Sequence, residues 1–98
     1  MTKNISFRVK RIYFDAIIAG TKKVELRALT PYWDRRLLHG AMPKSAVFVC
    51  GKDLHRRKII GISVDYPHRY LGRPLTADEK EIISTRLAIG IHLGAALE

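Results

Sequence analysis

The sequence has a single cysteine, Cys50, among its 98 residues. One cysteine cannot form a disulfide bond within the chain, so the fold does not depend on an internal cross-link, and such usage fits a reducing compartment. We therefore expect a cytoplasmic protein. Cys50 ends the apolar run of residues 45–50, which predicts a small buried side chain and not a nucleophile.

Long hydrophobic runs are also absent. No apolar stretch approaches the about 18 residues that a membrane-spanning helix requires, and no secretory leader is recognisable. We therefore expect no membrane association. The length fits one domain, which we place at residues 1–96, with residues 97–98 as a possible expression-tag remnant.

The residue patterns of several common active sites are missing. The four histidines, at positions 39, 55, 68 and 92, have no metal-ligand spacing, and one cysteine cannot build a zinc knuckle. There is no glycine-rich phosphate loop of the usual types and no nucleophile elbow. We therefore predict neither a metal site nor another cofactor.

Acidic residues are few, with 9 Asp and Glu against 18 Lys and Arg, which gives a formal net charge of +9. In a small domain this imbalance produces a strong positive field, which favours a polyanion such as nucleic acid over an anionic membrane surface. A solubilising surface is the alternative, but solubility requires no such imbalance of sign. The charge therefore predicts a nucleic acid or a nucleotide-like ligand.

The rest of the sequence is organised around residues 20–27, Gly-Thr-Lys-Lys-Val-Glu-Leu-Arg. The preceding residues, 12–19, have the apolar spacing of an amphipathic helix. Gly20 suits the left-handed residue that follows a helix. We therefore expect the chain to turn directly from this helix into a strand.

Apolar and charged side chains alternate along that strand. In an extended chain Val24 and Leu26 point to one face. Lys23, Glu25 and Arg27 then share the other face. A carboxylate flanked by cations has its charged form favoured, and a guanidinium suits a planar carboxylate or phosphate partner. The alternative is a half-exposed strand whose charged outer face does little.

Strand and helix patterns follow one another along the whole chain. We predict strands at residues 5–9, 23–28, 45–50, 59–66 and 88–93, and helices at residues 12–19, 32–39 and 77–87. Thr30-Pro31 and the capping box of Thr76 and Glu79 mark two helix starts. These elements indicate an α+β domain: a small, mostly antiparallel β-barrel flanked by short helices.

Two further segments combine charge with other features. Residues 51–58 are predicted to be a polar turn, whose cations either contact phosphates or form a solvated hairpin tip. If residues 66–70 stay extended, Tyr66, His68 and Tyr70 share one side. Their mixture of aromatic and basic groups is typical of a base-stacking platform. The alternative is that the aromatic rings plug a barrel corner.

The Gly-x-Lys-x-x-Glu-x-Arg pattern of residues 20–27 resembles the signature of the ASCH (activating signal cointegrator homology) domain, a member of the PUA-like superfold. Residues 5–9 are similar to the first strand of that family, residues 13–20 to the helix before the motif, and residues 89–94 to the closing strand. The resemblance spans nearly the whole chain. It implies a PUA-like barrel in which the segment after the motif strand borders a cleft.

The resemblance also implies a function connected with RNA. ASCH domains look like RNA-interaction modules, and some small prokaryotic members resemble enzymes, either amidohydrolases acting on acetylated cytidine or ribonucleases. In the amidohydrolase branch a threonine nucleophile follows the motif lysine by three residues. Lys22 matches that lysine, but Glu25 occupies the threonine position, and this departure argues against that acyl-transfer mechanism.

We therefore predict an RNA- or nucleotide-binding module with a basic cleft built around the motif. The alternative is a small hydrolase acting on RNA or a modified nucleoside, in which Glu25 is a general base and Lys22 stabilises negative charge. A third interpretation is a protein-interaction module whose charge is incidental. The candidate ligand-binding residues are Lys22, Lys23, Glu25, Arg27, Arg35, Arg36, Lys44, Arg56, Arg57, Lys58, Tyr66, His68, Arg69 and Tyr70.

Overall fold

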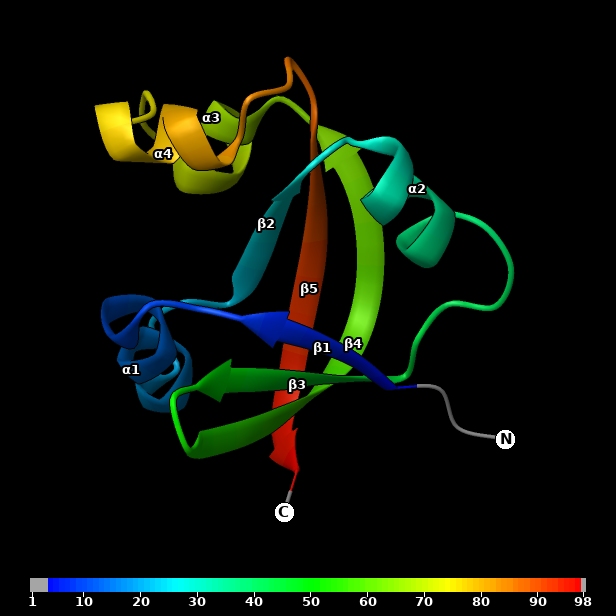
Figure 1. Ribbon diagram of the computed structural model, residues 1–98, viewed down its shortest axis with the longest axis vertical. Coiled ribbons are helices and arrows are strands. Elements are labelled where there is room, and N and C mark those ends of the chain that lie inside the picture. The colour runs from blue at the N-terminus through cyan, green and yellow to red at the C-terminus, as the bar shows by residue number, and fades with distance from the viewer. Residues whose placement is uncertain (1–3, 98) are drawn as a thin grey trace.

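Residues 4–97, which the computed structural model describes, form one mixed five-stranded β-sheet flanked by four short helices (Figure 1). The elements are, in chain order, β1 (Asn4–Arg8), α1 (Arg11–Ala19), β2 (Val24–Ala28), α2 (Pro31–Leu37), β3 (Ser45–Cys50), β4 (Asp53–Asp65), α3 (Pro67–Leu71), α4 (Ala77–Ile82) and β5 (Ala88–Leu97).

The sheet is a half-barrel. Its strand order is β1-β3-β4-β5-β2. β1 and β3 run parallel, and the other three neighbouring pairs are antiparallel. The edge strands β1 and β2 do not pair with each other, so the curved sheet stays open between them (Figure 1). The predicted fold, an α+β domain with a small, mostly antiparallel barrel and short helices, is therefore confirmed.

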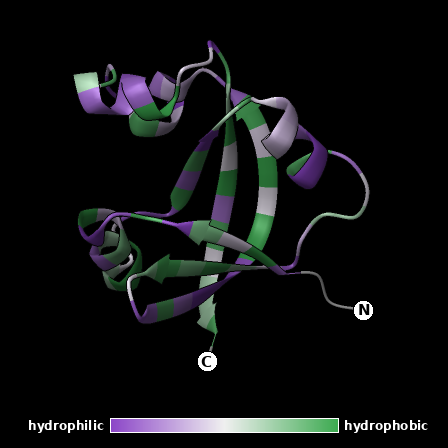
Figure 2. Cartoon of the chain, viewed as in Figure 1, coloured by the Kyte–Doolittle hydropathy of each residue, from purple (hydrophilic) through white to green (hydrophobic). Residues whose placement is uncertain are grey.

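The long strand β4 gives the sheet much of its curvature. Its first part, residues 53–58, pairs with β3, and its later part continues along β5. The register shifts between Arg57 and Ile59 and again between Ile59 and Gly61, and such bulges bend a strand and increase its twist. The first half of β4 is mainly hydrophilic and the second half mainly hydrophobic (Figure 2), so the bend separates a solvated half from a core-forming half.

The main hydrophobic core lies on the inner side of the half-barrel. Phe7 of β1 and Phe48 of β3 stack with ring centroids 5.7 Å apart. Ile17 of α1, Leu37 of α2 and Ile91 of β5 belong to the same buried cluster. Full burial of one such side chain contributes about 1.5–3 kcal/mol. Because helices this short are marginal alone, packing against this core is what holds α1 and α2 in place.

A second, smaller cluster lies on the opposite face of β2 and β5. Leu26 and Ala88 come from the two strands, and Ile83 and Tyr70 pack against them from the segment that contains α3 and α4. A side chain on Gly90 would place its Cβ 2.5 Å from Cε1 of Tyr70. Glycine is therefore required there, because the Tyr70 ring lies directly on the strand.

The local signals in the sequence predicted several boundaries correctly. Gly20 follows α1 in the left-handed conformation, with φ of 78°. The hydroxyl of Thr30 accepts a hydrogen bond from the backbone N–H of Trp33 at 3.3 Å. Thr76 and Glu79 form the expected capping box at the start of α4. Each signal depends only on neighbouring residues, which is why the sequence alone reveals it.

A turn does join two antiparallel strands within residues 51–58, but the predicted extent of that turn is wrong. The turn consists of Gly51 and Lys52 alone, with Gly51 at φ of 59°, and β4 begins at Asp53. The charged residues that follow belong to a strand, because an antiparallel sheet can bury one face and leave the other solvated.

The extended conformation considered for residues 66–70 is not the one that the segment adopts. Residues 67–71 form the helix α3, in which Pro67 takes the first helical position and Gly72 follows in the left-handed conformation, with φ of 69°. Proline has the backbone angle of a first helical residue and needs no N–H there. Pro67 therefore begins this helix.

The helix predicted at residues 77–87 ends five residues early. α4 stops at Ile82, and Ile83 leaves the helical region with φ of −105° and ψ of 82°. The hydroxyl of Thr85 donates to the carbonyl of Leu87 and accepts from the N–H of Leu29. Such side-chain hydrogen bonds to the backbone compete with a helix.

Two further predictions concern the chain ends and the membrane. Leu97 is the last residue of β5, whereas residues 1–3 of the polar start and residue 98 of the suggested tag remnant lie outside the described residues. In the part of the chain that the structure describes, no helix has the length and hydrophobicity to span a bilayer.

Candidate functional site

A cleft lies at the open side of the half-barrel, between the edges of β1 and β2 and below α4. Its volume is about 230 Å³. Four cations and two carboxylates contribute to its walls, together with apolar side chains and one tyrosine. The lining residues are Arg8, Val9, Lys10, Tyr13, Lys22, Glu25, Leu26, Arg27, Leu71, Glu79, Ile82 and Ile83. We call this site the edge cleft.

A wider pocket of about 480 Å³ adjoins the edge cleft. The two share five lining residues, which include Tyr13, Lys22 and Glu79. The wider pocket adds two cations, Lys23 and Arg73. The two pockets therefore form a continuous groove between α1 and β2 on one side and α3 and α4 on the other, with a net positive lining.

Glu25 is the buried centre of the edge cleft. Its Oε1 lies 3.0 Å from Nζ of Lys22, and its Oε2 lies 2.8 Å from Nη2 of Arg27. Only 3% of Glu25 is exposed. Both carboxylate oxygens therefore have a charged partner, which is what a buried carboxylate requires.

The register of β2 explains why these charges are buried. Glu25 pairs with Ile91 and Arg27 pairs with Ile89 of β5, and both isoleucines face the main core. Leu26 pairs with Gly90 and belongs to the second cluster on the opposite face. The predicted alternation is confirmed, and the alternative of a half-exposed charged face is wrong for Glu25.

Arg27 joins the two edges of the half-barrel. Its Nη2 donates to the Arg8 carbonyl of β1 at 3.2 Å as well as to Glu25. Its guanidinium carbon lies 4.9 Å from the ring centroid of Phe7 and 5.4 Å from that of Trp33. Within residues 4–97, Nε of Arg27 is buried with no hydrogen-bond partner. Arg27 is therefore a structural clamp across the opening.

Lys22 is the motif cation that retains donors for a ligand. Its Nζ carries three N–H groups, and within residues 4–97 Glu25 is the one carboxylate with which it forms an ion pair. The ammonium also lies 4.7 Å from the ring centroid of Tyr13, and 22% of the Lys22 side chain is exposed. Lys22 therefore faces both parts of the groove, with its charge held in place by a carboxylate and an aromatic ring.

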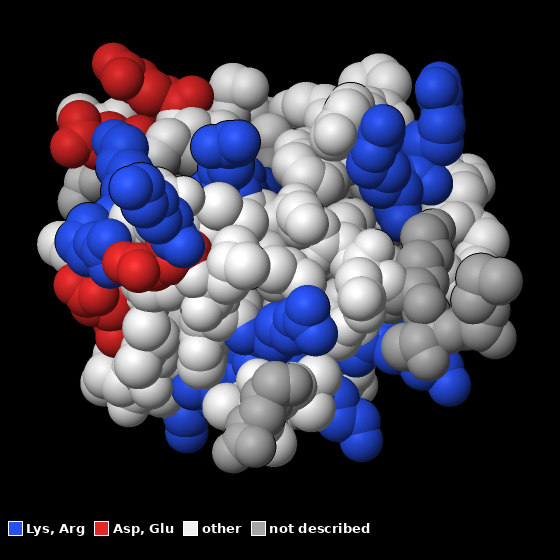
Figure 3. All heavy atoms as spheres, turned by 60° about the horizontal axis from the view of Figure 1, so that its bottom comes forward, with Lys and Arg blue, Asp and Glu red and all other residues white. Residues whose placement is uncertain are grey.

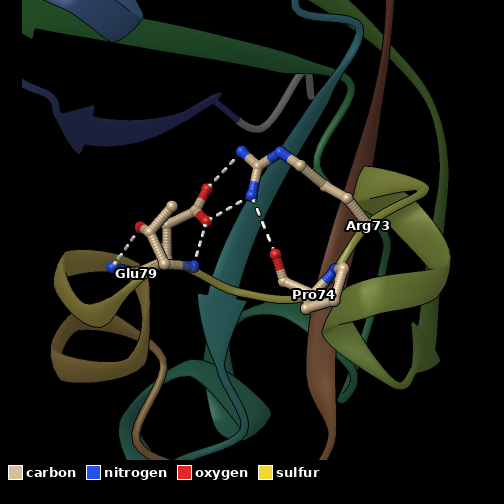
Figure 4. A network of polar contacts seen from close by, with 4 residues as sticks. Arg73, Pro74 and Glu79 are labelled. Atoms are coloured by element: carbon tan, nitrogen blue, oxygen red, sulfur yellow. Dashed lines mark hydrogen bonds and ion pairs between the residues drawn. The ribbon is translucent and has the colours of Figure 1, made fainter.

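Arg73 and Glu79 form the opposite wall of the groove. Two nitrogens of Arg73 donate to the two oxygens of Glu79 at 2.6 and 2.9 Å, and Nη1 also donates to the Pro74 carbonyl (Figure 4). The hydrogen bond from Arg73, and next the one from the N–H of Thr76, lowers the pKa of Glu79 to about 2. Glu79 is therefore a fixed negative charge that faces the cleft.

The predicted rim cations Arg35, Arg36 and Lys44 line neither part of this groove. Arg35 and Arg36 are exposed on α2, and the guanidinium of Arg36 lies 3.6 Å from the ring centroid of Tyr32. Lys44 is exposed in the segment before β3. The fold thus places these three cations away from the motif.

The three predicted cations of β4 separate into two groups. Arg56 and Lys58 are exposed, whereas Arg57 is half-buried. Arg57 donates to the carbonyl of Ile17 at 2.6 Å, to that of Gly94 at 3.1 Å and to Nε2 of His55 at 3.1 Å. These bonds connect α1, β4 and β5, so the geometry gives Arg57 a structural position.

The predicted aromatic residues do not form one platform. The rings of Tyr66 and His68 stack with centroids 5.8 Å apart. Tyr70 points to the sheet, where its hydroxyl contacts Oγ of Ser63 at 2.7 Å, and that oxygen also lies 2.8 Å from Nε2 of His92. Nε of Arg69 lies 3.7 Å from Oδ1 of Asp65, the last residue of β4. Of the candidates at residues 66–70, only Tyr70 lines the groove.

Five charged or aromatic lining residues of the groove were not predicted. In the sequence these residues belong to patterns that indicate structure and not a ligand site. These patterns are, in chain order, a strand end, a basic pair, a helix face, a loop and a helix cap. The five residues are Arg8, Lys10, Tyr13, Arg73 and Glu79. Among residues 4–97, no three His, Cys, Asp or Glu side chains gather as a metal site would require.

The open half-barrel with short helices and an edge cleft has the architecture of the ASCH and PUA-like fold. The structure is similar to the crystal structure of a mutant ZmASCH protein from Zymomonas mobilis, with a TM-score of 0.67 over 95% of this chain and 68% of that chain. The two sequences are 14% identical, so the likeness shows the fold. No protein-family model and no curated protein matches the sequence.

Proposed function

We propose that the groove binds RNA or a nucleotide, with a phosphate in the edge cleft. The observation that carries this proposal is the lining of the edge cleft, where Arg8, Lys10 and Lys22 stand beside the buried Glu25–Arg27 pair. Cations that contact phosphates position a ligand without reading its sequence. A tyrosine and several apolar side chains complete the mixed lining that is typical of small-ligand sites.

The residues of the motif have different roles in this proposal. Glu25 orients Lys22 and neutralises Arg27, and Arg27 holds the two strand edges together. Lys22 and Lys10 then supply the donors for the ligand phosphate. The Tyr13 ring, which lies under the Lys22 ammonium and lines both parts of the groove, is the surface nearest to a base.

The charge of the whole chain and its fold support the same partner. The net charge is +9. In the view of Figure 3 the acidic side chains gather at the left, where Lys and Arg stand among them, and the charged side chains seen on the rest of that face are Lys and Arg. Such a field attracts polyanions over the whole surface, and the resemblance to ASCH domains implies an RNA-related ligand.

Binding of a labelled single-stranded RNA to the full chain tests the proposal. We expect log affinity to fall with log salt, with a slope of about −0.7 for each phosphate neutralised, when measured between about 50 and 200 mM salt. Lys10→Ala should weaken binding and make this slope less steep by about 0.7. Lys80→Ala is the matched control, because Lys80 is exposed on α4 and lines neither pocket.

Duplex DNA of equal length provides the comparison ligand. Equal effects of Lys10→Ala and Lys80→Ala on RNA affinity would reject the edge cleft as the site. Affinity that does not depend on salt would reject phosphate recognition altogether. Arg27→Ala is unsuitable as a binding test, because loss of the clamp would also open the half-barrel.

One contact favours hydrolysis of RNA or of a modified nucleoside as a second candidate function. Lys22 Nζ and Glu25 Oε1 lie 3.0 Å apart in the edge cleft, so a cation and a carboxylate face the same ligand site. Both oxygens of Glu25 are occupied, so a general base there requires one ion pair to open. A gel of the incubated RNA tests turnover. Cleavage that Glu25→Gln abolishes would support the enzyme, and intact RNA would reject ribonuclease activity.

A further inference from the structure

The outer side of β1, β3 and the first half of β4 is a surface separate from the edge cleft. Phe7, Phe48 and His55 form one row across the three strands, and Phe7 and Phe48 point into the main core. Because side chains alternate along a strand, the neighbouring rows point outward. These outward rows are Asn4–Ser45–Lys58, Ser6–Val47–Arg56 and Arg8–Val49–Leu54. We call this surface the outer face.

No helix packs on the outer face in the described part of the chain. The buried residues of α1 and α2, Phe14, Ile17 and Leu37, belong to the main core on the inner side. α3 and α4 lie over β2 and β5, at the other end of the sheet. Leu54 is accordingly 63% exposed. Ser45 is buried and Val47 and Val49 are half-buried, but the other side chains of the outward rows are exposed to solvent.

The charge of the outer face has one sign. Arg8, Arg56 and Lys58 are exposed, and none of them forms an ion pair with a carboxylate of residues 4–97. The outward rows contain no Asp or Glu. In the edge cleft, by contrast, Lys22 and Arg27 are paired with Glu25. The positive charge of the outer face is therefore available to a ligand.

The spacing of these cations follows from the register. Arg56 and Lys58 are two residues apart on β4, which separates their Cα atoms by about 7 Å. Arg8 lies two strands away from β4, about 10 Å across the sheet. Arg8 also lines the edge cleft, so the outer face and the cleft meet at this residue.

We propose that the outer face binds the phosphate backbone of single-stranded RNA as the strand leaves the edge cleft past Arg8. The choice of RNA rests on the proposed function of the cleft. The outward rows carry no aromatic side chain on which a base could stack, so this contact is to the backbone and independent of sequence. The protein then binds a polymer along two joined surfaces, not a nucleotide alone.

Length-dependent RNA binding by the full chain tests this inference. The probes are single-stranded RNAs of about 4 and about 16 nucleotides. Arg56→Ala/Lys58→Ala should weaken binding of the long RNA and make its salt slope less steep by about 1.4, two phosphates at about 0.7 each. Binding of the short RNA should stay unchanged. Arg35→Ala/Lys80→Ala removes the same charge from exposed positions outside both surfaces and is the control.

Each result is decisive for one of the two surfaces. Equal losses in the outer-face variant and the control overturn the inference, whatever happens in the cleft. Loss of long-RNA binding in the outer-face variant, with no effect of Lys10→Ala on either RNA, keeps the outer face as an RNA-binding surface but overturns the part of the inference that joins it to the cleft. Salt-sensitive binding to phosphatidylserine vesicles, lost in the outer-face variant, without binding of the long RNA overturns the inference in favour of a membrane surface.

Discussion

Glu25→Gln tests whether the ion pairs of the edge cleft stabilise the fold. The substitution keeps the shape of the side chain but removes the charge between Lys22 and Arg27, whose side chains are 22% and 18% exposed. Removal of one partner from a buried ion pair costs about 3–5 kcal/mol, because the remaining charge is uncompensated. Glutamine keeps one neutral acceptor and the cations retain some contact with water, so we expect a loss of about 3 kcal/mol.

Thermal unfolding followed by circular dichroism measures this loss. In a domain of this size, 1 kcal/mol corresponds to about 4–8 °C in Tm, so Glu25→Gln should melt about 12–24 °C below the wild type. Glu81→Gln is the control, because Glu81 is exposed on α4 and forms no salt bridge within residues 4–97. The double variant Lys22→Met/Glu25→Gln should lose less free energy of unfolding than the sum of the losses in the two single variants, because the two residues interact directly. A Tm for Glu25→Gln equal to that of Glu81→Gln would refute the reasoning.

Three further predictions concern pH and packing. The folded-state pKa of Glu79 is lowered to about 2 from 4.5, so its stabilisation is present above about pH 4.5 and lost as the pH falls towards 2; the Tm difference between wild type and Glu79→Gln should shrink over that range, and a constant difference would contradict it. Burial, and next the charge of Arg57, lowers the pKa of His55; its ring should titrate below pH 6.5 by NMR, so that its protonation destabilises the fold as the pH falls through that region. Gly90→Ala puts a Cβ 2.5 Å from Tyr70 and should cost about 1–3 kcal/mol in urea unfolding; an equal cost in a Tyr70→Ala background would rule out this clash.

The sequence predicted the parts of the fold that depend on neighbouring residues. The glycine after α1 and the two hydroxyl caps act through the local backbone, and the alternation around Glu25 follows from the geometry of a strand. The charged composition of residues 51–58 led to the prediction of a long polar turn. Charge does not show whether a segment pairs with another strand. Residues 53–58 form a strand because they pair with β3, and that partner lies outside the segment itself.

The site was predicted only in part, for a similar reason. Lys22, Glu25 and Arg27 lie within one motif, and the fold brings all three together. The opposite wall comes from Arg73 and Glu79, about 50 residues further along the chain, and no local pattern connects it to the motif. The burial of Glu25 also required the register with β5, which turns the charged side of β2 towards the core.

The parallel pairing of β1 with β3 has a consequence for how the protein folds. β1 pairs with a strand that begins 41 residues later, Asn4 with Ser45, and it has no other strand neighbour in the sheet. Non-local pairing is slow, and an edge strand held on one side is a candidate for local opening. Arg8, one wall of the edge cleft, is carried by this strand. Occupancy of the cleft therefore stabilises the docked β1 by mass action, and protection of the β1 amides from hydrogen exchange becomes a direct report of ligand binding.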